Sequence, residues 1–65
     1  MAKYDGMLNL RLVRTKRKMT QRELGNLVGV NSKAISCYET GLRYPRRDIL
    51  EKLAAALECE IKDIV

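Results

Sequence analysis

Hydrophobic residues recur at intervals of three and four along most of the chain, with polar residues between them. This period is typical of amphipathic helices, each of which buries one face. Glycine, proline and short polar residues separate the hydrophobic stretches and mark where helices begin and end. The pattern therefore predicts an all-α protein, a compact bundle of four helices with a short fifth, without internal repeats or linkers.

The first helix is expected to begin at Asp5 or a neighbouring residue and to end at about Lys16 or Lys18. Its inward stripe includes Leu10, Val13 and Arg17. Residues 1–5 form a short N-terminal arm that we expect to be mobile.

The second helix has a clear start signal in Thr20 and Glu23, which have the spacing of a capping box. In this motif the hydroxyl accepts from a first-turn amide and the carboxylate accepts from the Thr20 amide. Gly29 is expected to end the helix in the left-handed conformation. The residues predicted to point inward are Leu24, Leu27 and Val28.

A third helix is predicted from Ser32 to about Thr40, with Asn31 as its N-cap and Gly41 at its end. Ile35 and Tyr38 are expected on its buried side.

Pro45 then turns the chain, since proline fixes its own φ and disfavours a helical Tyr44. A fourth helix is predicted from about Arg47 to Leu57, and residues 60–65 add one further turn. The apolar residues of that turn are Ile61, Ile64 and Val65. They either close the core of the monomer or form a surface for self-association.

Length and charge restrict the class of protein. A chain of 65 residues buries only about 60% of the surface that its unfolded form exposes, so we expect one domain, residues 1–65, with a modest core. Lys and Arg number 13 against 8 Asp and Glu, a net charge of +5 that suits a polyanionic partner. Neither a membrane span nor a secretory signal is predicted, and the protein is expected in the cytoplasm.

The chemistry of an enzyme is not evident. The chain has no histidine, its two cysteines, Cys37 and Cys59, do not form a CxxC pair, and no glycine-rich phosphate loop is present. We expect no metal, cofactor, small-molecule ligand or catalytic activity. The cysteines are interpreted as reduced thiols that act as small side chains, in preference to a redox-sensing disulfide.

Residues 20–40 place two short helices around a glycine turn, an arrangement suited to the DNA major groove. If Ile35 and Tyr38 face the core, the other side of the third helix is free to contact bases. The candidate base-contacting residues are Asn31, Ser32, Lys33, Ser36 and Cys37. The alternative for each of them is a solvated polar face.

Phosphate contacts are expected on both sides of that helix. Gln21 lies in the first turn of the second helix, where free backbone amides and the helix dipole attract anions; otherwise it is an ordinary exposed residue. Arg43, Arg46 and Arg47 follow the third helix and are candidates for guanidinium–phosphate contacts. Arg46 and Arg47 are alternatively hydrated, or Arg47 pairs with an acid of its own helix.

The sequence from Leu10 to about Leu57 resembles the lambda-repressor-like, or XRE, family of helix-turn-helix phage repressors and Cro proteins. The positions that match the family pattern are Leu10, Val13, Arg14, Thr20, Gln21, Glu23, Leu24, Gly29, Val30, Ile35, Ser36, Tyr38, Glu39, Gly41, Arg43, Pro45, Leu50, Leu53, Ala54 and Leu57. The resemblance implies a five-helix domain, bacterial or phage-encoded, that binds operator DNA as a homodimer with its third helix in the major groove.

Several residue roles follow from this resemblance. Gln21 matches the glutamine that contacts phosphate, and Ser32, Lys33 and Cys37 match positions that contact bases. Arg14 and Glu39 match a partly buried ion pair between the first and third helices.

Three positions depart from the family pattern. Gly25 replaces the usual alanine, and both residues are small enough for the helices to approach. Arg46 replaces the residue that commonly caps the fourth helix, and Glu58 replaces the glycine that commonly follows it.

The resulting expectation is a sequence-specific regulator of transcription, a repressor that binds double-stranded DNA with a palindromic operator as a homodimer. Ile61, Ile64 and Val65 are the candidate dimer contacts. The alternative is a protein-interaction module, such as the antitoxin of a toxin–antitoxin pair or a member of an anti-repressor pair.

Overall fold

The computed structural model describes residues 6–65 and contains five helices in that range, as predicted. They are α1 (Leu8–Lys16), α2 (Gln21–Val28), α3 (Ser32–Thr40), α4 (Arg47–Ala56) and α5 (Ile61–Ile64). The predicted N-terminal arm lies outside the described residues. No helix of residues 6–65 combines the length and the apolar character that crossing a membrane requires.

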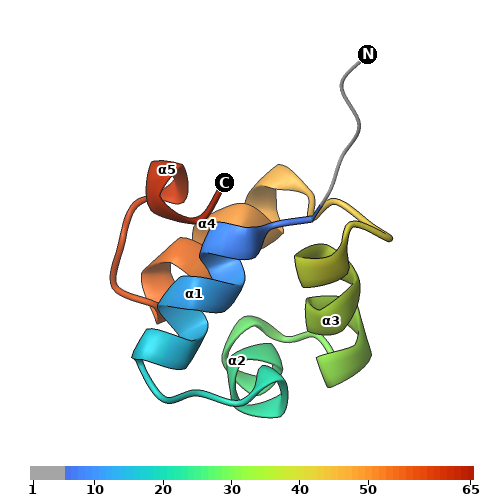
Figure 1. The fold of residues 1–65 in the computed structure, drawn as a ribbon, viewed down its shortest axis with the longest axis horizontal. Coiled ribbons are helices and arrows are strands. Elements are labelled where there is room, and N and C mark those ends of the chain that lie inside the picture. The colour runs from blue at the N-terminus through green and yellow to red at the C-terminus, as the bar shows by residue number, and fades with distance from the viewer. Residues whose placement is uncertain (1–5) are drawn as a thin grey trace.

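The helices surround one hydrophobic core to which all five of them contribute (Figure 1). α1 packs against α3 and α5, and α4 packs against α2 and α5. The largest fully buried side chains are Leu10, Leu24, Ile35, Leu53, Leu57 and Ile64. Because the core takes side chains from α5 as well as from α1, the last turn holds the two ends of the described chain together.

The helix ends in the middle of the chain lie where local signals place them. Thr20 and Glu23 form the predicted capping box, and the Asn31 side chain accepts a hydrogen bond from the Ala34 amide. Gly29 and Gly41 have φ values of 83° and 92°, so both helices end in the left-handed conformation. These predictions are confirmed.

The start of α1 was predicted wrongly. Gly6 has a φ of 100°, and the Met7 amide donates to the Tyr38 carbonyl at 3.0 Å, so the helix begins only at Leu8. A Cβ at Gly6 would collide with the backbone of Glu39. Because this segment packs against the end of α3, α1 starts later in the sequence than predicted.

The inward stripe of α1 also differs from the prediction. Leu10 is buried and Val13 packs against the core, but Arg17 is exposed and caps the C-terminus of the helix. Arg14 is buried instead, because it has an acidic partner on α3. An inward arginine is stable when its charge is paired in this way.

Leu27 was predicted to point inward, but 61% of its surface is exposed. The buried residues of α2 are Leu24, Gly25 and Val28. Because a helix turns by roughly 100° per residue, these residues centre the buried face on the side away from Leu27. Because Gly25 packs closely, the buried face of α2 is centred on a different side of the helix from the one that its apolar residues predict.

Ile64 was predicted as a candidate dimer contact, but it is 0% exposed in the monomer. Its neighbours differ: Ile61 is half-buried against the core and Val65 is 49% exposed. Burial of Ile64 is the means by which the single turn of α5 attaches to the bundle, so this residue is not available for self-association.

Candidate nucleic-acid interface

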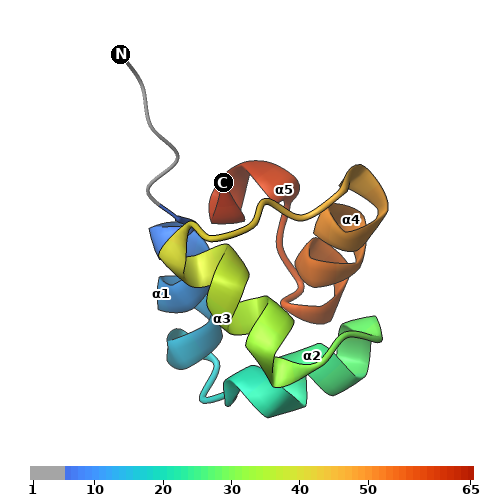
Figure 2. The same cartoon turned by 90° about the vertical axis from the view of Figure 1, so that its right-hand side faces the viewer.

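One side of the molecule carries α3 with α2 and the α3–α4 connection on either side of it. Figure 2 faces this side, with α3 in front, α2 below it and the connection to α4 above it. The sequence-predicted base and phosphate contacts all lie on these elements or at the start of α4. We define this side as the α3 face.

α3 has two distinct sides. Ile35, Tyr38 and Glu39 are buried, whereas Ser32 and Lys33 are exposed. Ser36 and Cys37 are half-buried, so they are less accessible than the prediction assumed. The outward surface is thus concentrated in the first turn of α3, which is the part of a recognition helix that enters the major groove first.

Asn31 has a structural role in addition to its predicted DNA contact. Its Oδ1 accepts from the Ala34 amide at 2.8 Å, which satisfies one of the free amides at the start of α3. Its amide nitrogen takes no part in this cap and can donate to a base or a phosphate.

The start of α2 is held by reciprocal bonds. The Thr20 amide donates to Glu23 Oε1 at 2.8 Å, and the Glu23 amide donates to Thr20 Oγ1 at 3.0 Å. This cap places Gln21 and the exposed Arg22 in the first turn of α2. Arg22 was missed as a candidate phosphate contact, although its place in that turn was the available signal.

A buried network joins α1, α2 and α3. Arg14 Nε lies 2.6 Å from Glu39 Oε2 and its Nη2 lies 3.2 Å from Oε1, while Nη1 donates to the Met19 carbonyl at 2.7 Å. Gln21 Nε2 donates to Glu39 Oε1 at 3.0 Å. The structure therefore contains the ion pair that the resemblance implied, and adds Gln21 and Met19 to it.

The α3–α4 connection brings basic residues to the α3 face. Arg43, Tyr44 and Arg46 line a hollow of about 520 Å3 together with residues of the α2–α3 turn, among them Asn31. Arg46 Nε lies 3.7 Å from Asp48 Oδ1, whereas no ion pair within residues 6–65 involves Arg43. The Arg46 pair is exposed and therefore weak, so both guanidinium groups are available to a phosphate.

Arg47 is turned toward its own helix. Its Nε lies 3.5 Å from Glu51 Oε2, one turn along α4, and both side chains are exposed. This is the alternative that sequence considerations left open for Arg47. Such an exposed pair is weak, so a phosphate can compete for the guanidinium.

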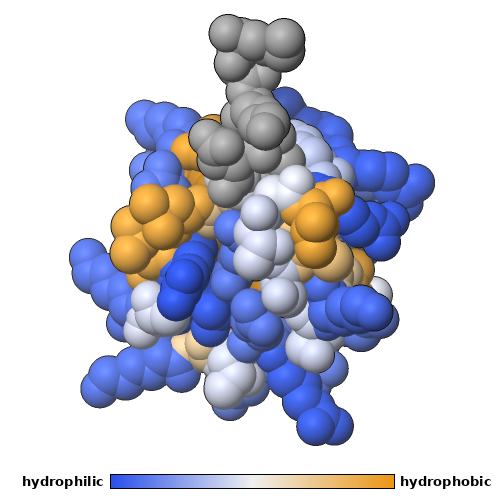
Figure 3. Space-filling model, turned by 45° about the vertical axis from the view of Figure 1, so that its right-hand side comes forward, coloured by the Kyte–Doolittle hydropathy of each residue, from blue (hydrophilic) through white to orange (hydrophobic). Residues whose placement is uncertain are grey.

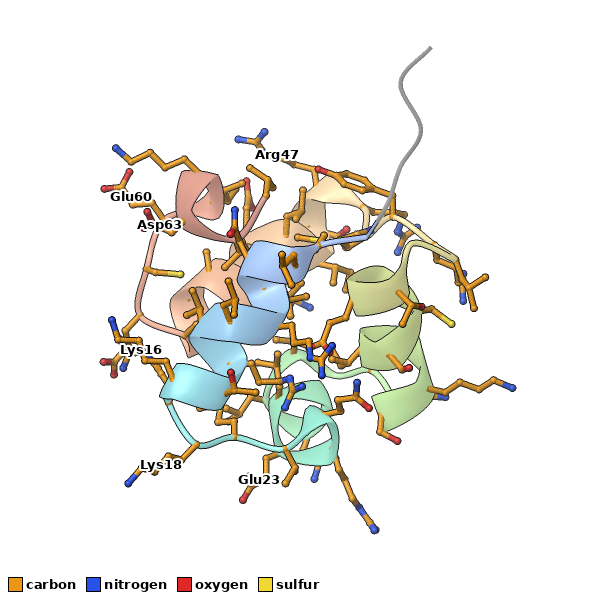
Figure 4. The ribbon with its side chains drawn as sticks, viewed as in Figure 1. Lys16, Lys18, Glu23, Arg47, Glu60 and Asp63 are labelled. Carbon is orange, nitrogen blue, oxygen red and sulfur yellow. The ribbon has the colours of Figure 1, made fainter. Side chains whose placement is uncertain are left out.

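Charge is distributed unevenly over the fold. Residues 6–45 contain eight Lys and Arg against two acids, and one of those acids, Glu39, is buried with Arg14. In Figure 4, Glu60 and Asp63 lie beside α5, on the opposite side of the molecule from α3. The excess positive charge therefore lies in residues 6–45, which include α1 as well as the elements of the α3 face.

Apolar surface is present in separate patches. Figure 3 shows a mainly hydrophilic surface with hydrophobic side chains gathered at different places. On α1, Leu8 and Leu12 are exposed one turn apart, and Leu42 and Tyr44 are exposed after α3. The α3 face therefore combines the polar first turn of α3 with two exposed hydrophobic side chains, Leu42 and Tyr44, in the α3–α4 connection.

Both cysteines are free thiols. Cys59 lies in a groove of about 700 Å3 between the end of α1 and α5. Burial, with a contribution from the negative charge of Asp63, raises the pKa of this thiol above its usual value. Among residues 6–65, no group of His, Cys, Asp and Glu is arranged to hold a metal ion.

Comparison with known proteins agrees with this geometry. A helix-turn-helix family model matches residues 10–64. The P22 c2 repressor protein, solved in complex with synthetic operator 9T, is 31% identical over all of this chain and 96% of its own, with a TM-score of 0.85. The restriction-modification controller protein C.AhdI from Aeromonas hydrophila is 29% identical over 89% of this chain and 88% of its own, with a TM-score of 0.84.

A third similar structure is PlcR from Bacillus thuringiensis, in complex with the peptide PapR7 and DNA. It is 31% identical over 94% of this chain but only 21% of its own length, with a TM-score of 0.80. No curated protein matches the chain by sequence.

The chain belongs to the helix-turn-helix family, with the lambda-repressor-like, XRE-type fold. Family and fold together assign it to the DNA-binding transcriptional regulators.

Proposed function

We propose that this protein is a repressor that binds a palindromic operator as a homodimer, in the cytoplasm of a bacterium and on bacterial or phage DNA. The observation that carries the proposal is the exposed first turn of α3, which presents Ser32 and Lys33 between Gln21 of α2 and Arg43 of the α3–α4 connection. Bases and flanking phosphates would be contacted from one rigid surface.

The residues divide into two roles on this surface. Lys33 would donate to guanine acceptors in the major groove, with Ser32 and the Asn31 amide beside it. Gln21, Arg43 and Arg46 would hold the phosphates on either side. Bound at a promoter, the protein would repress by occlusion; the similarity to the P22 c2 repressor, solved in complex with an operator, supports the role of a repressor.

A homodimer would place two copies of α3 about 34 Å apart, one turn of DNA. Val65 and Ile61 remain the candidate contacts after the burial of Ile64. They are supported by exposed apolar residues nearby, because α5 packs on α1, where Leu8 and Leu12 face solvent.

Base and phosphate contacts are distinguished by substitution. Lys33→Ala is expected to lower affinity for the selected operator by about 5- to 100-fold and to relax the preferred sequence at one position. Arg43→Ala should weaken binding to all duplexes alike and reduce the salt slope by roughly one unit. Gln21→Ala should weaken all duplexes with an unchanged slope, because the amide is neutral.

The measurement is fluorescence anisotropy at several salt concentrations, with an operator selected from random duplex DNA and a scrambled duplex. Lys52→Ala on α4 is the matched control, since it removes one exposed cation that lies on neither the α3 face nor α5. Equal losses on both duplexes for Lys33→Ala would contradict base recognition by α3.

A further inference from the structure

Glu39 is an acidic residue of α3 that is buried beneath the α3 face. Only 3% of its side chain is exposed, and its carboxylate receives three donors: two nitrogens of Arg14 and Nε2 of Gln21. Gln21, by contrast, is half-buried at the start of α2 and therefore reaches both the interior and the surface. Glu39 is thus connected to the surface of α2 through one hydrogen bond.

The chemistry of this bond fixes the orientation of the Gln21 amide. An ionised carboxylate accepts hydrogen bonds and donates none, so the amide must turn its nitrogen toward Glu39. One N–H is used in that bond at 3.0 Å, and the second N–H is left for an acceptor outside the protein. The reversed amide would set its oxygen against the carboxylate, which is unfavourable.

The carboxylate is itself held in place. Arg14 binds it with two nitrogens and is anchored through Nη1 to the Met19 carbonyl, in the segment that joins α1 to α2. Because both carboxylate oxygens of Glu39 are held in place, the Gln21 amide has one favourable orientation, with its nitrogen toward Glu39. The amide is therefore oriented before any ligand arrives, which lowers the entropic cost of binding.

We propose that Glu39 is a positioning residue for DNA binding, which orients the Gln21 amide so that an N–H donor faces the phosphate. The inference rests on the proposed function, because it assumes that Gln21 contacts a phosphate. Simple electrostatics predicts that an acid close to DNA weakens binding by repelling the phosphates. The proposal predicts the opposite, that Glu39 increases the affinity for DNA. Without the carboxylate the amide rotates freely, and its oxygen is presented to the phosphate part of the time.

The primary test compares Glu39→Gln with Glu58→Gln, which makes the same change of charge at an exposed site paired with Arg17. Anisotropy with the selected operator is expected to show binding weakened on the order of tenfold by Glu39→Gln. Glu58→Gln should leave binding unchanged or slightly tighter, because it only removes a negative charge. An affinity for Glu39→Gln equal to or above that of the wild type would overturn the inference.

A double-mutant cycle separates positioning from a general structural effect. In a Gln21→Ala background, Glu39→Gln is expected to cause less than a further twofold loss, since the amide it positions is absent. The same tenfold loss in both backgrounds would show that Glu39 acts through the orientation of α3 and not through Gln21, which overturns the inference.

Glu39→Gln leaves Arg14 without a charged partner and can unfold the domain. The double variant Arg14→Leu/Glu39→Leu removes both charges, and it is expected to fold and to show the same loss of affinity. In the free wild-type protein, NMR should show that one of the two Gln21 side-chain amide hydrogens is protected from exchange; two equally exchanging hydrogens would overturn the inference. A wild type without duplex affinity would overturn the proposed function as well.

Discussion

Within residues 6–65, two residues that are not glycine adopt the left-handed backbone, Lys18 after α1 with a φ of 59° and Glu58 after α4 with a φ of 55°. Both helices end in the same way. The Met19 amide donates to the Arg14 carbonyl and the Cys59 amide donates to the Ala54 carbonyl, the six-residue bond of a Schellman motif. A Cβ in this conformation costs roughly 1 kcal/mol, so each helix end is satisfied at the expense of local strain.

Replacement of Glu58 by glycine is therefore expected to raise the free energy of unfolding by about 0.5–1 kcal/mol. The lost contact with Arg17 is an exposed ion pair of little value. Urea denaturation measures the change. Glu58→Ala is the control, because it loses the same ion pair but keeps the Cβ; equal stability of the two variants would show that the backbone strain is negligible.

At the scale of elements, the packing of α2 against the turn before α3 depends on Gly25. A Cβ at this position would lie 2.5 Å from the Val30 carbonyl oxygen, closer than packed atoms approach. The expectation that alanine would also be small enough at this position is therefore wrong for this chain. The missing side chain lets the turn that carries Asn31 lie directly against α2.

Gly25→Ala is expected to lower the free energy of unfolding by about 1 kcal/mol. The gain in helix propensity, about 1 kcal/mol, is exceeded by an overpacking cost of roughly 1–3 kcal/mol. Operator affinity should fall as well, because the turn that starts α3 has to move. Asn26→Ala, at an exposed site of the same helix, gains propensity without the collision. Urea denaturation measures the free energy of unfolding of both variants. Equal stabilisation by Gly25→Ala and Asn26→Ala would disprove the packing argument.

For the whole molecule, α5 determines which apolar residues remain available for a partner. Ile64 is fully buried, whereas Val65 is half exposed and its carbonyl accepts a hydrogen bond from Asn9 Nδ2 at 3.0 Å. Ile64 of α5 thus fills the core, whereas the next residue, Val65, lies at the surface beside α1.

Val65→Asp is expected to retain the fold and to weaken self-association by at least about tenfold, since a charge would replace an apolar contact. Ile64→Asp is the contrasting variant and should unfold the domain, because it buries an unpaired charge. Sedimentation with and without operator, together with thermal melting, measures both effects. A Val65→Asp protein that dimerises like the wild type would exclude this surface as the interface.

Much of the candidate site was predictable because its signals are local. The start of α2 at the capping box, its end at Gly29 and the Asn31 cap depend on residues within four positions of one another. The sequence therefore specified the two helices, their turn and the exposure of Ser32 and Lys33. The DNA contacts themselves stay predictions, since they concern a second molecule.

Other features needed the fold because their causes lie far along the chain. The late start of α1 follows from the contact of Gly6 with Glu39, and the bond from Gln21 to Glu39 joins residues 18 positions apart. Helical periodicity identified apolar residues in α2 and α5, but the exposure of Leu27 and the burial of Ile64 depend on how neighbouring helices meet. Short-range hydrogen bonds and backbone preferences depend on neighbouring residues, so the sequence alone determines them. The contacts of each side chain with other helices depend on how the helices pack, so only the tertiary structure determines them.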